Sequence, residues 1–249
     1  MLPEYELIQS IQEGRNSGID EAISKGATVD ARSLSGLTVL EVAQKYGRFN
    51  TGRELIKRGA DIHQIIGQNG DTLLHRAART GDIGFTTLLL ESGADPDAVN
   101  TAGKSPLHYA ANGGFQYLAH ELIRAGASVD LATPAGDTAL HFAAKKGHVP
   151  MIRSLLDPAA DADAFAKNNT GYTPLHEAAA AGKTEAVTLL IDKSRIGSHA
   201  KATLLPRIRR AAELHGHLDT AQAILAAEAS ASPSSSFRSS TDDSTGIDR

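Results

Sequence analysis

The organisation of the chain follows from one stretch, Ser105-Pro106-Leu107-His108-Tyr109-Ala110-Ala111-Asn112-Gly113-Gly114, because close copies of it recur on both sides. The other copies occupy residues 38–47 (TVLEVAQKYG), 72–81 (TLLHRAARTG), 138–147 (TALHFAAKKG) and 173–182 (TPLHEAAAAG). A glycine lies two positions before each copy, and these glycines, Gly36, Gly70, Gly103, Gly136 and Gly171, are 34, 33, 33 and 35 residues apart. A repeat of this length predicts a stack of similar units, each packed on its neighbours.

Each copy has the features of a short helix. The Thr or Ser at its start is a residue type that caps a helix N-terminus with its hydroxyl oxygen. Pro106 and Pro174 stand at the first helical position, where proline loses no hydrogen bond. Leu and Ala residues recur at i, i+3 and i+4, which predicts one apolar stripe. A second helix, with pairs such as Leu89-Leu90, follows each copy and ends at a glycine such as Gly93.

The motif T-P-L-H-x-A with a period near 33 resembles the ankyrin repeat. The resemblance implies an all-α fold, an ankyrin-repeat solenoid of stacked helix pairs, in which the extended residues between units form projecting β-turn or hairpin fingers. Full repeats are expected at about 33–65, 66–98, 99–132, 133–167 and 168–200. Degenerate copies at 4–32 and 201–228 are interpreted as caps, so that one ankyrin-repeat domain fills residues 1–228. The Ser-rich segment 229–249 is expected to be a disordered tail.

Two units depart from this pattern. In the unit at 33–65, Val39 and Glu41 replace the Pro and His of the motif, so its first helix is expected to begin less sharply. In the unit at 136–165, Ala159-Ala160 stands where Gly-Ala is expected. The finger after this pair is therefore expected to be two residues longer than its neighbours, and to protrude or bend differently.

The overall charge and residue types limit the classes of partner. A net charge of −4 gives no basic excess for binding nucleic acid, so none is expected. The absence of cysteine excludes disulfides and thiolate ligands and is compatible with a reducing compartment. No secretory signal is recognised, and no run of 18 apolar residues predicts a membrane span. We expect a monomer in the cytoplasm, with the nucleus or delivery into a host cell as a bacterial effector as alternatives.

Four histidines, His75, His108, His141 and His176, recur with the motif and suggest a metal site. Neighbouring units stack about 8–10 Å apart, whereas zinc requires nitrogen ligands at about 2 Å. Each histidine is therefore expected to hydrogen-bond the Thr or Ser at the head of its own helix and to bridge to the adjoining finger. The chain contains no phosphate loop, Gly-x-Ser-x-Gly elbow or His-Glu-x-x-His motif. No metal, cofactor or catalytic residue is expected.

The resemblance implies a function. In ankyrin-repeat proteins the concave face, built from the fingers and the first helices, usually binds another protein. The chain is therefore expected to be a non-enzymatic protein–protein interaction module, such as an adaptor, an inhibitor or an effector-type scaffold. The alternative is an enzyme, or a regulatory subunit, that binds a small charged ligand in the cup.

The residues expected to contact the partner stand in the fingers and just before the glycine that ends each first helix, where residue type varies between copies. They are Lys45, Tyr46, Asp71, Arg79, Lys104, Asn112, Asp137, Lys145, Lys146, Phe165 and Tyr172. Three of the five helix positions carry Lys or Arg, a basic stripe that favours a partner with an acidic patch. A further basic trio, Arg207, Arg209 and Arg210, is interpreted as a solvated outer face of the C-terminal cap, with binding of an acidic partner or nucleic acid as the alternatives.

Overall fold

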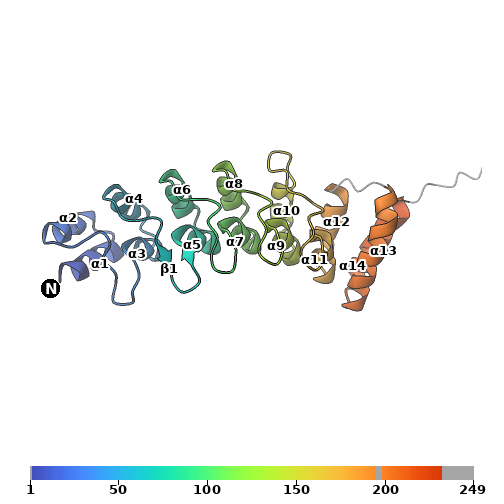
Figure 1. Cartoon of the computed structure of the whole chain (residues 1–249), viewed down its shortest axis with the longest axis horizontal. Coiled ribbons are helices and arrows are strands. Elements are labelled where there is room, and N and C mark those ends of the chain that lie inside the picture. Colours follow the sequence, from blue (N-terminus) through green and yellow to red (C-terminus); the bar gives the residue numbers. More distant parts are fainter. Residues whose placement is uncertain (1, 194–197, 232–249) are drawn as a thin grey trace, which may run out of the picture.

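The computed structural model of the protein describes residues 2–193 and 198–231, in which seven helix pairs stack in a row (Figure 1). The first helices are α1 (Pro3–Glu13), α3 (Val39–Lys45), α5 (Leu73–Thr80), α7 (Pro106–Gly113), α9 (Ala139–Lys146), α11 (Pro174–Ala180) and α13 (Ser198–Leu214). The second helices are α2 (Asn16–Ser24), α4 (Phe49–Lys57), α6 (Ile83–Glu91), α8 (Gln116–Arg124), α10 (Val149–Leu155), α12 (Thr184–Lys193) and α14 (Leu218–Ala231). The expected all-α solenoid is confirmed, and no helix of the described residues is long and apolar enough to cross a bilayer.

The residues that the motif keeps constant form the core. Leu107 of α7 is 1% exposed, and Ala110 and Ala111 are fully buried. The helix packs against both α5 and α9, so these side chains lie between neighbouring units. Because alanine is small, the first helices approach closely, and the leucine of each unit fills the space that remains. The core is one continuous cluster that runs from α1 to α14.

The fourth residue of the motif caps its own helix. Nδ1 of His108 accepts a hydrogen bond from the backbone N–H of Ser105 at 3.0 Å and lies 2.9 Å from its hydroxyl oxygen. In α3 the same place is taken by Glu41, whose Oε2 accepts from the backbone N–H of Thr38 at 2.8 Å. The backbone N–H of Glu41 in turn donates to Oγ1 of Thr38 at 3.2 Å. The expectation that α3 begins less sharply is therefore wrong, because a carboxylate completes the capping box as an imidazole does.

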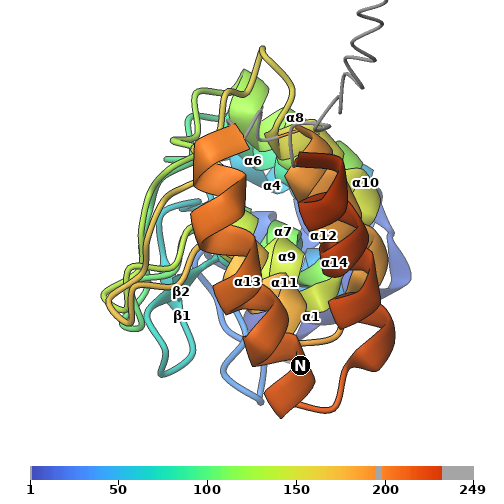
Figure 2. The same ribbon diagram turned by 90° about the vertical axis from the view of Figure 1, so that its right-hand side faces the viewer.

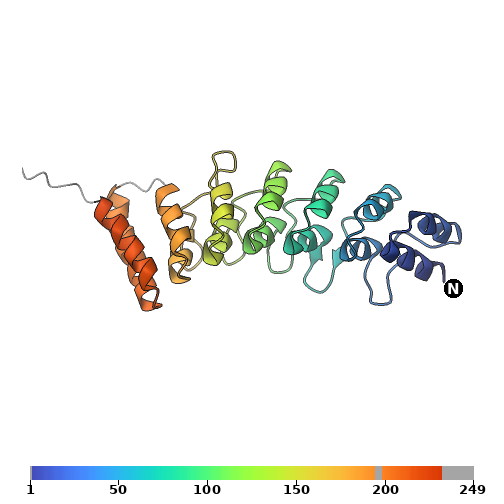
Figure 3. The same cartoon turned by 180° about the vertical axis from the view of Figure 1, so that it is seen from behind.

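The connections between units project as fingers along one side of the row (Figures 2 and 3). We number them in chain order and use four of them: finger 2 (61–72), finger 3 (95–105), finger 4 (128–138) and finger 5 (163–173). Finger 2 contains the antiparallel pair of β1 (Ile65–Ile66) and β2 (Asp71–Thr72). Backbone hydrogen bonds join the fingers: Thr101 N–H donates to the Asn69 carbonyl at 3.0 Å, and Asn169 N–H to the Ala135 carbonyl at 2.9 Å.

The structure corrects the expected length of finger 5. Asp161 has φ 57°, the left-handed conformation that Gly126, two residues before finger 4, adopts with φ 97°. Asp161 and Gly171 are ten positions apart, as are Gly126 and Gly136, so finger 5 has the ordinary length. The two extra residues lie before Asp161, in the connection that loops out after α10 (Figure 1). Aspartate tolerates this backbone conformation better than most non-glycine residues, so it can take the place of the glycine.

Both ends of the row are formed by helix pairs. The N-terminal unit contains a complete pair, α1 and α2, although its sequence has lost the first half of the motif. At the other end α14 continues to Ala231, so residues 229–231 belong to this helix and not to the expected tail. The remainder of that tail, residues 232–249, lies outside the described residues.

Gln44 in α3 carries a buried side-chain amide whose nitrogen and oxygen have no hydrogen-bond partner in the part of the chain that is described. The equivalent residue in the other copies is alanine. Replacing Gln44 with methionine, Gln44→Met, keeps most of the volume and removes the unsatisfied polar atoms. We expect the free energy of unfolding to rise by about 1 kcal/mol in urea denaturation. Gln44→Glu, which buries a charge at the same place, should lower it, and a loss of stability in Gln44→Met would contradict the assignment.

Candidate protein-binding surface

The side chains that vary between copies gather on one surface, which we call the finger-side face. It is formed by the fingers, by the residues just before the glycine that ends each first helix, and by the fifth residue of each motif copy. These fifth residues are Val42, Arg76, Tyr109, Phe142 and Glu177. Their neighbours in the motif are buried, so the scaffold is constant while the face changes from unit to unit.

Ion pairs cross this face from one unit to the next. Arg76 Nη1 lies 2.8 Å from Glu41 Oε1, and Lys145 Nζ lies 3.2 Å from Glu177 Oε2. Arg79 Nη1 lies 3.1 Å from Asp71 Oδ2. The predicted basic stripe is therefore largely neutralised, because Arg79 and Lys145 each have a carboxylate partner. Lys45 and Lys146 have none among the described residues, so the unpaired positive charge stands at these two places.

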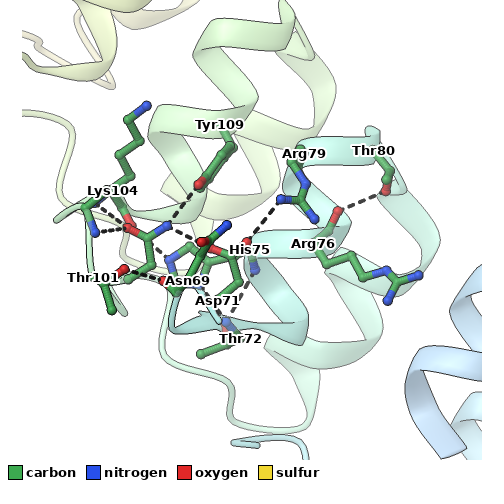
Figure 4. A network of polar contacts seen from close by, with 12 residues as sticks. Asn69, Asp71, Thr72, His75, Arg76, Arg79, Thr80, Thr101, Lys104 and Tyr109 are labelled. Carbon is green, nitrogen blue, oxygen red and sulfur yellow. Dashed lines mark hydrogen bonds and ion pairs between the residues drawn. The ribbon is translucent and has the colours of Figure 1, made fainter. Parts of the chain in front are cut away.

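Asp71 is the centre of a polar network between fingers 2 and 3 (Figure 4). It is 4% exposed and also accepts a hydrogen bond from Asn100 Nδ2 at 2.7 Å. The same Nδ2 donates to the Tyr109 hydroxyl at 2.9 Å. Two repeats on, Asn168 Nδ2 donates to Asp137 Oδ1 at 2.8 Å. These carboxylates fix the position of the next finger, and Asp71, expected to contact a partner, is a buried structural residue.

Lys104 extends from finger 3 over two aromatic rings of the finger-side face. Its Nζ lies 5.9 Å from the centre of the Tyr109 ring and 5.2 Å from that of Phe142. At these distances the ring faces attract the ammonium group. Lys104 is half-buried, so its charge remains partly accessible while its position is fixed by the two rings.

The other predicted contact residues lie on the finger-side face or at its rim. Eight are exposed: Lys45, Tyr46, Arg79, Asn112, Lys145, Lys146, Phe165 and Tyr172. Lys104 and Asp137 are half-buried, and Asp71 is buried. Sequence reasoning missed Arg76, Tyr109, Phe142 and Glu177. The signal was present, because these residues occupy the variable x of T-P-L-H-x-A.

Three of the four motif histidines, His75, His108 and His141, bridge to the adjoining unit. Nε2 of His75, His108 and His141 lies 2.9, 3.2 and 3.0 Å from the carbonyl oxygens of Lys104, Asp137 and Tyr172. Each Nδ1 accepts a backbone N–H of its own helix cap, so the ring proton is on Nε2, which donates to the carbonyl. The expected bridge to the adjoining finger is confirmed for these three. Within the described residues no group of three metal-ligating side chains occurs.

Burial lowers the pKa of His75, His108 and His176, because the charged imidazolium is poorly solvated there. Between the lowered pKa and the ordinary value of about 6.5, the unfolded chain binds more protons than the folded one. We therefore expect the free energy of unfolding to fall as pH drops below about 6.5, by up to about 1.4 kcal/mol per pH unit for each such histidine. Urea denaturation at several pH values measures this slope. His108→Gln should make it shallower, and an unchanged slope would contradict the prediction.

One small cleft opens on the finger-side face between α3, α5 and finger 2. Its volume is about 150 Å³, and its charged lining residues are Glu41, Asp71, Arg76 and Arg79. These four side chains already form the two ion pairs Arg76–Glu41 and Arg79–Asp71. A small charged ligand would have to displace one of these partners.

Comparison with known proteins supports the repeat assignment. The family pattern described as "Ankyrin repeats (3 copies)" matches residues 7–100, 40–131, 74–165 and 107–203, so that the overlapping matches cover most of the chain. A crystal structure of an ankyrin repeat domain from Acinetobacter baumannii AYE is 28% identical, with a TM-score of 0.67. It covers 76% of this chain and 98% of that one.

Relatives from other organisms share part of the array. "Ankyrin repeat and KH domain-containing protein mask" of Drosophila melanogaster is 34% identical over 95 residues, 38% of this chain and 2% of that protein. "Palmitoyltransferase Hip14" of the same organism is 30% identical over 101 residues, 41% of this chain and 16% of that protein. A "Putative ankyrin repeat-containing protein" of Treponema pallidum is 26% identical over 41% of this chain and 34% of that protein. The alignments thus span a minor part of these relatives. With its repeats matched from residue 7 to residue 203, the chain belongs to the ankyrin-repeat family.

Proposed function

We propose that the chain is a non-enzymatic module that binds a partner protein through the finger-side face. The observation that carries the proposal is the separation of roles within the repeat. Constant residues are buried between units, while most of the variable ones are exposed or half-buried at equivalent places along the row; Val42 and Asp71 are buried. A face of this kind can change its chemistry without loss of fold. Ankyrin repeats are in general protein–protein interaction modules, and the family match supports the same use here.

The alternative, an enzyme or regulatory subunit with a small charged ligand, has less support. The ankyrin-repeat fold is generally non-catalytic. The name of Hip14 describes a palmitoyltransferase, but the alignment covers 16% of that protein. The charged cleft beside Arg76 and Arg79 is small, and both guanidinium groups already have carboxylate partners. We therefore propose an adaptor, inhibitor or scaffold role in a reducing compartment such as the cytoplasm, with which the absence of cysteine is compatible.

The unpaired cations favour a partner with an acidic patch. Lys45 lies beside its neighbour Tyr46, with Nζ 5.6 Å from the ring centre, and Lys146 ends α9. Both side chains are exposed and lack a carboxylate in the described residues, so a partner's Asp or Glu meets no intramolecular competitor there. At Arg79 and Lys145 a partner must compete with Asp71 and Glu177. We expect Lys45 and Lys146 to contribute more to association than Arg79 and Lys145.

The test begins with affinity purification and mass spectrometry to identify the partner. Lys45→Glu/Lys146→Glu should then weaken binding by about tenfold to a hundredfold, chiefly through slower association at low salt, because exposed charges steer encounter. The matched control is Lys57→Glu/Arg153→Glu, which reverses two exposed cations on the second helices α4 and α10. Surface plasmon resonance measures both rates. Equal losses in the two double variants, or a loss confined to the control, would move the binding surface away from the finger-side face.

A further inference from the structure

Finger 5 has an uncovered face. The tip glycines of fingers 2, 3 and 4 (Gly70, Gly103 and Gly136) lie against the next finger, whereas Gly36, the tip glycine before finger 2, has no described atom within 4 Å of its Cβ position. A Cβ added at Gly103 would stand 2.3 Å from Pro134 Cδ, and one at Gly136 would stand 2.8 Å from Asn168 Cα. At Gly171, the tip glycine of finger 5, no atom of the described residues lies within 4 Å of that position. The surface that receives a following finger elsewhere is therefore open here.

The connection between α12 and α13 is too short for a further finger of ordinary length. Between α8, which ends at Arg124, and α9, which begins at Ala139, 14 residues (125–138) form the connection that contains finger 4. Between the end of α12 at Lys193 and the start of α13 at Ser198 there are four, residues 194–197. The last helix pair thus stacks on the row without contributing a finger of ordinary length.

Next to this open face, Nε2 of His176 is a hydrogen-bond donor without a partner among the described residues. Nε2 of His75, His108 and His141 each donates to a carbonyl of the following finger. Nδ1 of His176 accepts the backbone N–H of Thr173 at 3.2 Å, so its proton is also on Nε2. Yet Nε2 of His176 has no hydrogen bond to any described residue. This N–H is not enclosed by the described residues, so water or the carbonyl oxygen of a partner can accept its hydrogen bond.

Finger 5 also has a backbone hydrogen-bond acceptor, the Thr170 carbonyl, without a donor from a following finger. The carbonyls of Asn69 and Ala135, each one residue before a finger's tip glycine, accept a backbone N–H from the next finger. The equivalent carbonyl in finger 5 is that of Thr170, to which no backbone N–H of the described residues donates. The carbonyls of Ser35 and Ala102, before Gly36 and Gly103, also accept no backbone N–H of the described residues. At Gly103 the next finger presents Pro134, which has no N–H.

Positive charge predominates around this place, because the Glu177 carboxylate, which acts on His176 in the opposite direction, is paired with Lys145. Arg207 of α13 and Lys167 of finger 5 both act on His176, and their charges add to burial in lowering its pKa. The Tyr172 ring stacks on the His176 ring, with centres 5.4 Å apart and planes at 18°, and remains 40% exposed. An acidic segment would be attracted here, and the tyrosine ring offers apolar contact to its backbone.

We propose that the open face of finger 5 is a docking site for an extended acidic segment of a partner protein, which takes the position of a following finger. One carbonyl of the segment accepts from His176 Nε2, and one of its amides donates to the Thr170 carbonyl. A carboxylate of the segment lies near Arg207. The inference rests on the proposed function, since it assumes a protein partner, and it adds a defined contact at the C-terminal end of the finger-side face. Strand-like additions of this kind gain affinity from main-chain hydrogen bonds.

The experiment uses the full chain and a peptide copied from the protein itself. The peptide has the sequence of residues 95–105 with Lys104→Asp, and a cysteine added at each end closes it through a disulfide. It keeps the two groups with which finger 3 contacts the preceding unit, the amide of Thr101 and the carbonyl of residue 104. Titration followed by NMR is expected to shift the His176 imidazole and the Gly171 amide, with a dissociation constant of about 1 mM or lower.

Two isosteric variants test the contact. His176→Gln keeps an acceptor for the helix cap and an N–H donor, and should bind the peptide within about threefold of the parent. His176→Glu keeps the cap, as Glu41 does in α3, but replaces the donor with a negative charge, and should bind about tenfold more weakly or worse. Arg207→Glu should also weaken binding, while Lys57→Glu, a charge control on α4, should not.

Equal binding by the His176→Glu and parent proteins, shifts confined to other units, or no saturable shift would each overturn the proposal. Absence of a saturable shift is also the result expected if another part of the chain already covers finger 5. These outcomes are distinguishable from failure of the proposed function. The peptide reports on finger 5 alone, whereas Lys45→Glu/Lys146→Glu reports on a partner bound at the helices of the finger-side face. Docking at finger 5 can therefore be disproved while partner binding at the helices is confirmed, and the reverse.

Discussion

Leu107→Ala is expected to lower the free energy of unfolding by about 2–5 kcal/mol. Leu107 is 1% exposed and lies in α7, in the middle of the row, where α5 and α9 pack on either side. Its removal leaves a cavity between three helices whose backbones are held by neighbouring units, so the site cannot collapse completely. Urea denaturation followed by circular dichroism measures the change in midpoint.

Leu34→Ala is the matched control, because the same atoms are removed from a side chain that is 98% exposed. Its effect should stay within about 0.5 kcal/mol of zero. In a repeat array the units interact with their nearest neighbours, so loss of the α7 contacts should also weaken α5 and α9. A Leu107→Ala protein that unfolds at the parent's midpoint would show that α7 does not pack between the two helices.

The sequence predicted the repeated scaffold because each step of that scaffold is local. An N-cap and its imidazole are three residues apart, as in Ser105 and His108, and a buried stripe follows from helical spacing. The repetition of these local signals in five copies then implied the stack. The bridge from His108 to the Asp137 carbonyl was also predictable, since the histidine recurs at the same place in four of the five motif copies.

The candidate site was predicted less well because burial in a finger depends on the next unit. Asp71 has the same place in its finger as Lys104, yet it is buried, since Asn100 and Arg79 surround its carboxylate. No spacing within one repeat shows that pairing. Asp161 illustrates a second limit. The glycine spacing shows that this unit has two extra residues. Whether they lie within the finger or before it depends on which residue adopts the left-handed conformation, and that residue is Asp161.

Gly136→Ala and Gly171→Ala are expected to differ although both residues have a positive φ, 82° and 79°. In either place an added Cβ strains the backbone by about 1–2 kcal/mol. At Gly136 the Cβ also meets the backbone of finger 5, 2.8 Å from Asn168 Cα and from the amide nitrogen of Asn169. Main-chain atoms cannot turn away as a side chain can, so fingers 4 and 5 must separate. We expect Gly136→Ala to lower the free energy of unfolding by about 2–5 kcal/mol in total.

The comparison isolates the contact between fingers, because the strain from φ is common to both variants and cancels in the difference. Separation of fingers 4 and 5 should weaken the hydrogen bond from Asn169 N–H to the Ala135 carbonyl, which amide hydrogen exchange at Asn169 reports directly. In Gly171→Ala that amide should exchange at the parent's rate. If the two variants lose the same stability, the face of finger 5 is covered in the free chain as the face of finger 4 is. The carbonyl of Thr170 and Nε2 of His176 would then have partners already, and an acidic peptide could not dock there.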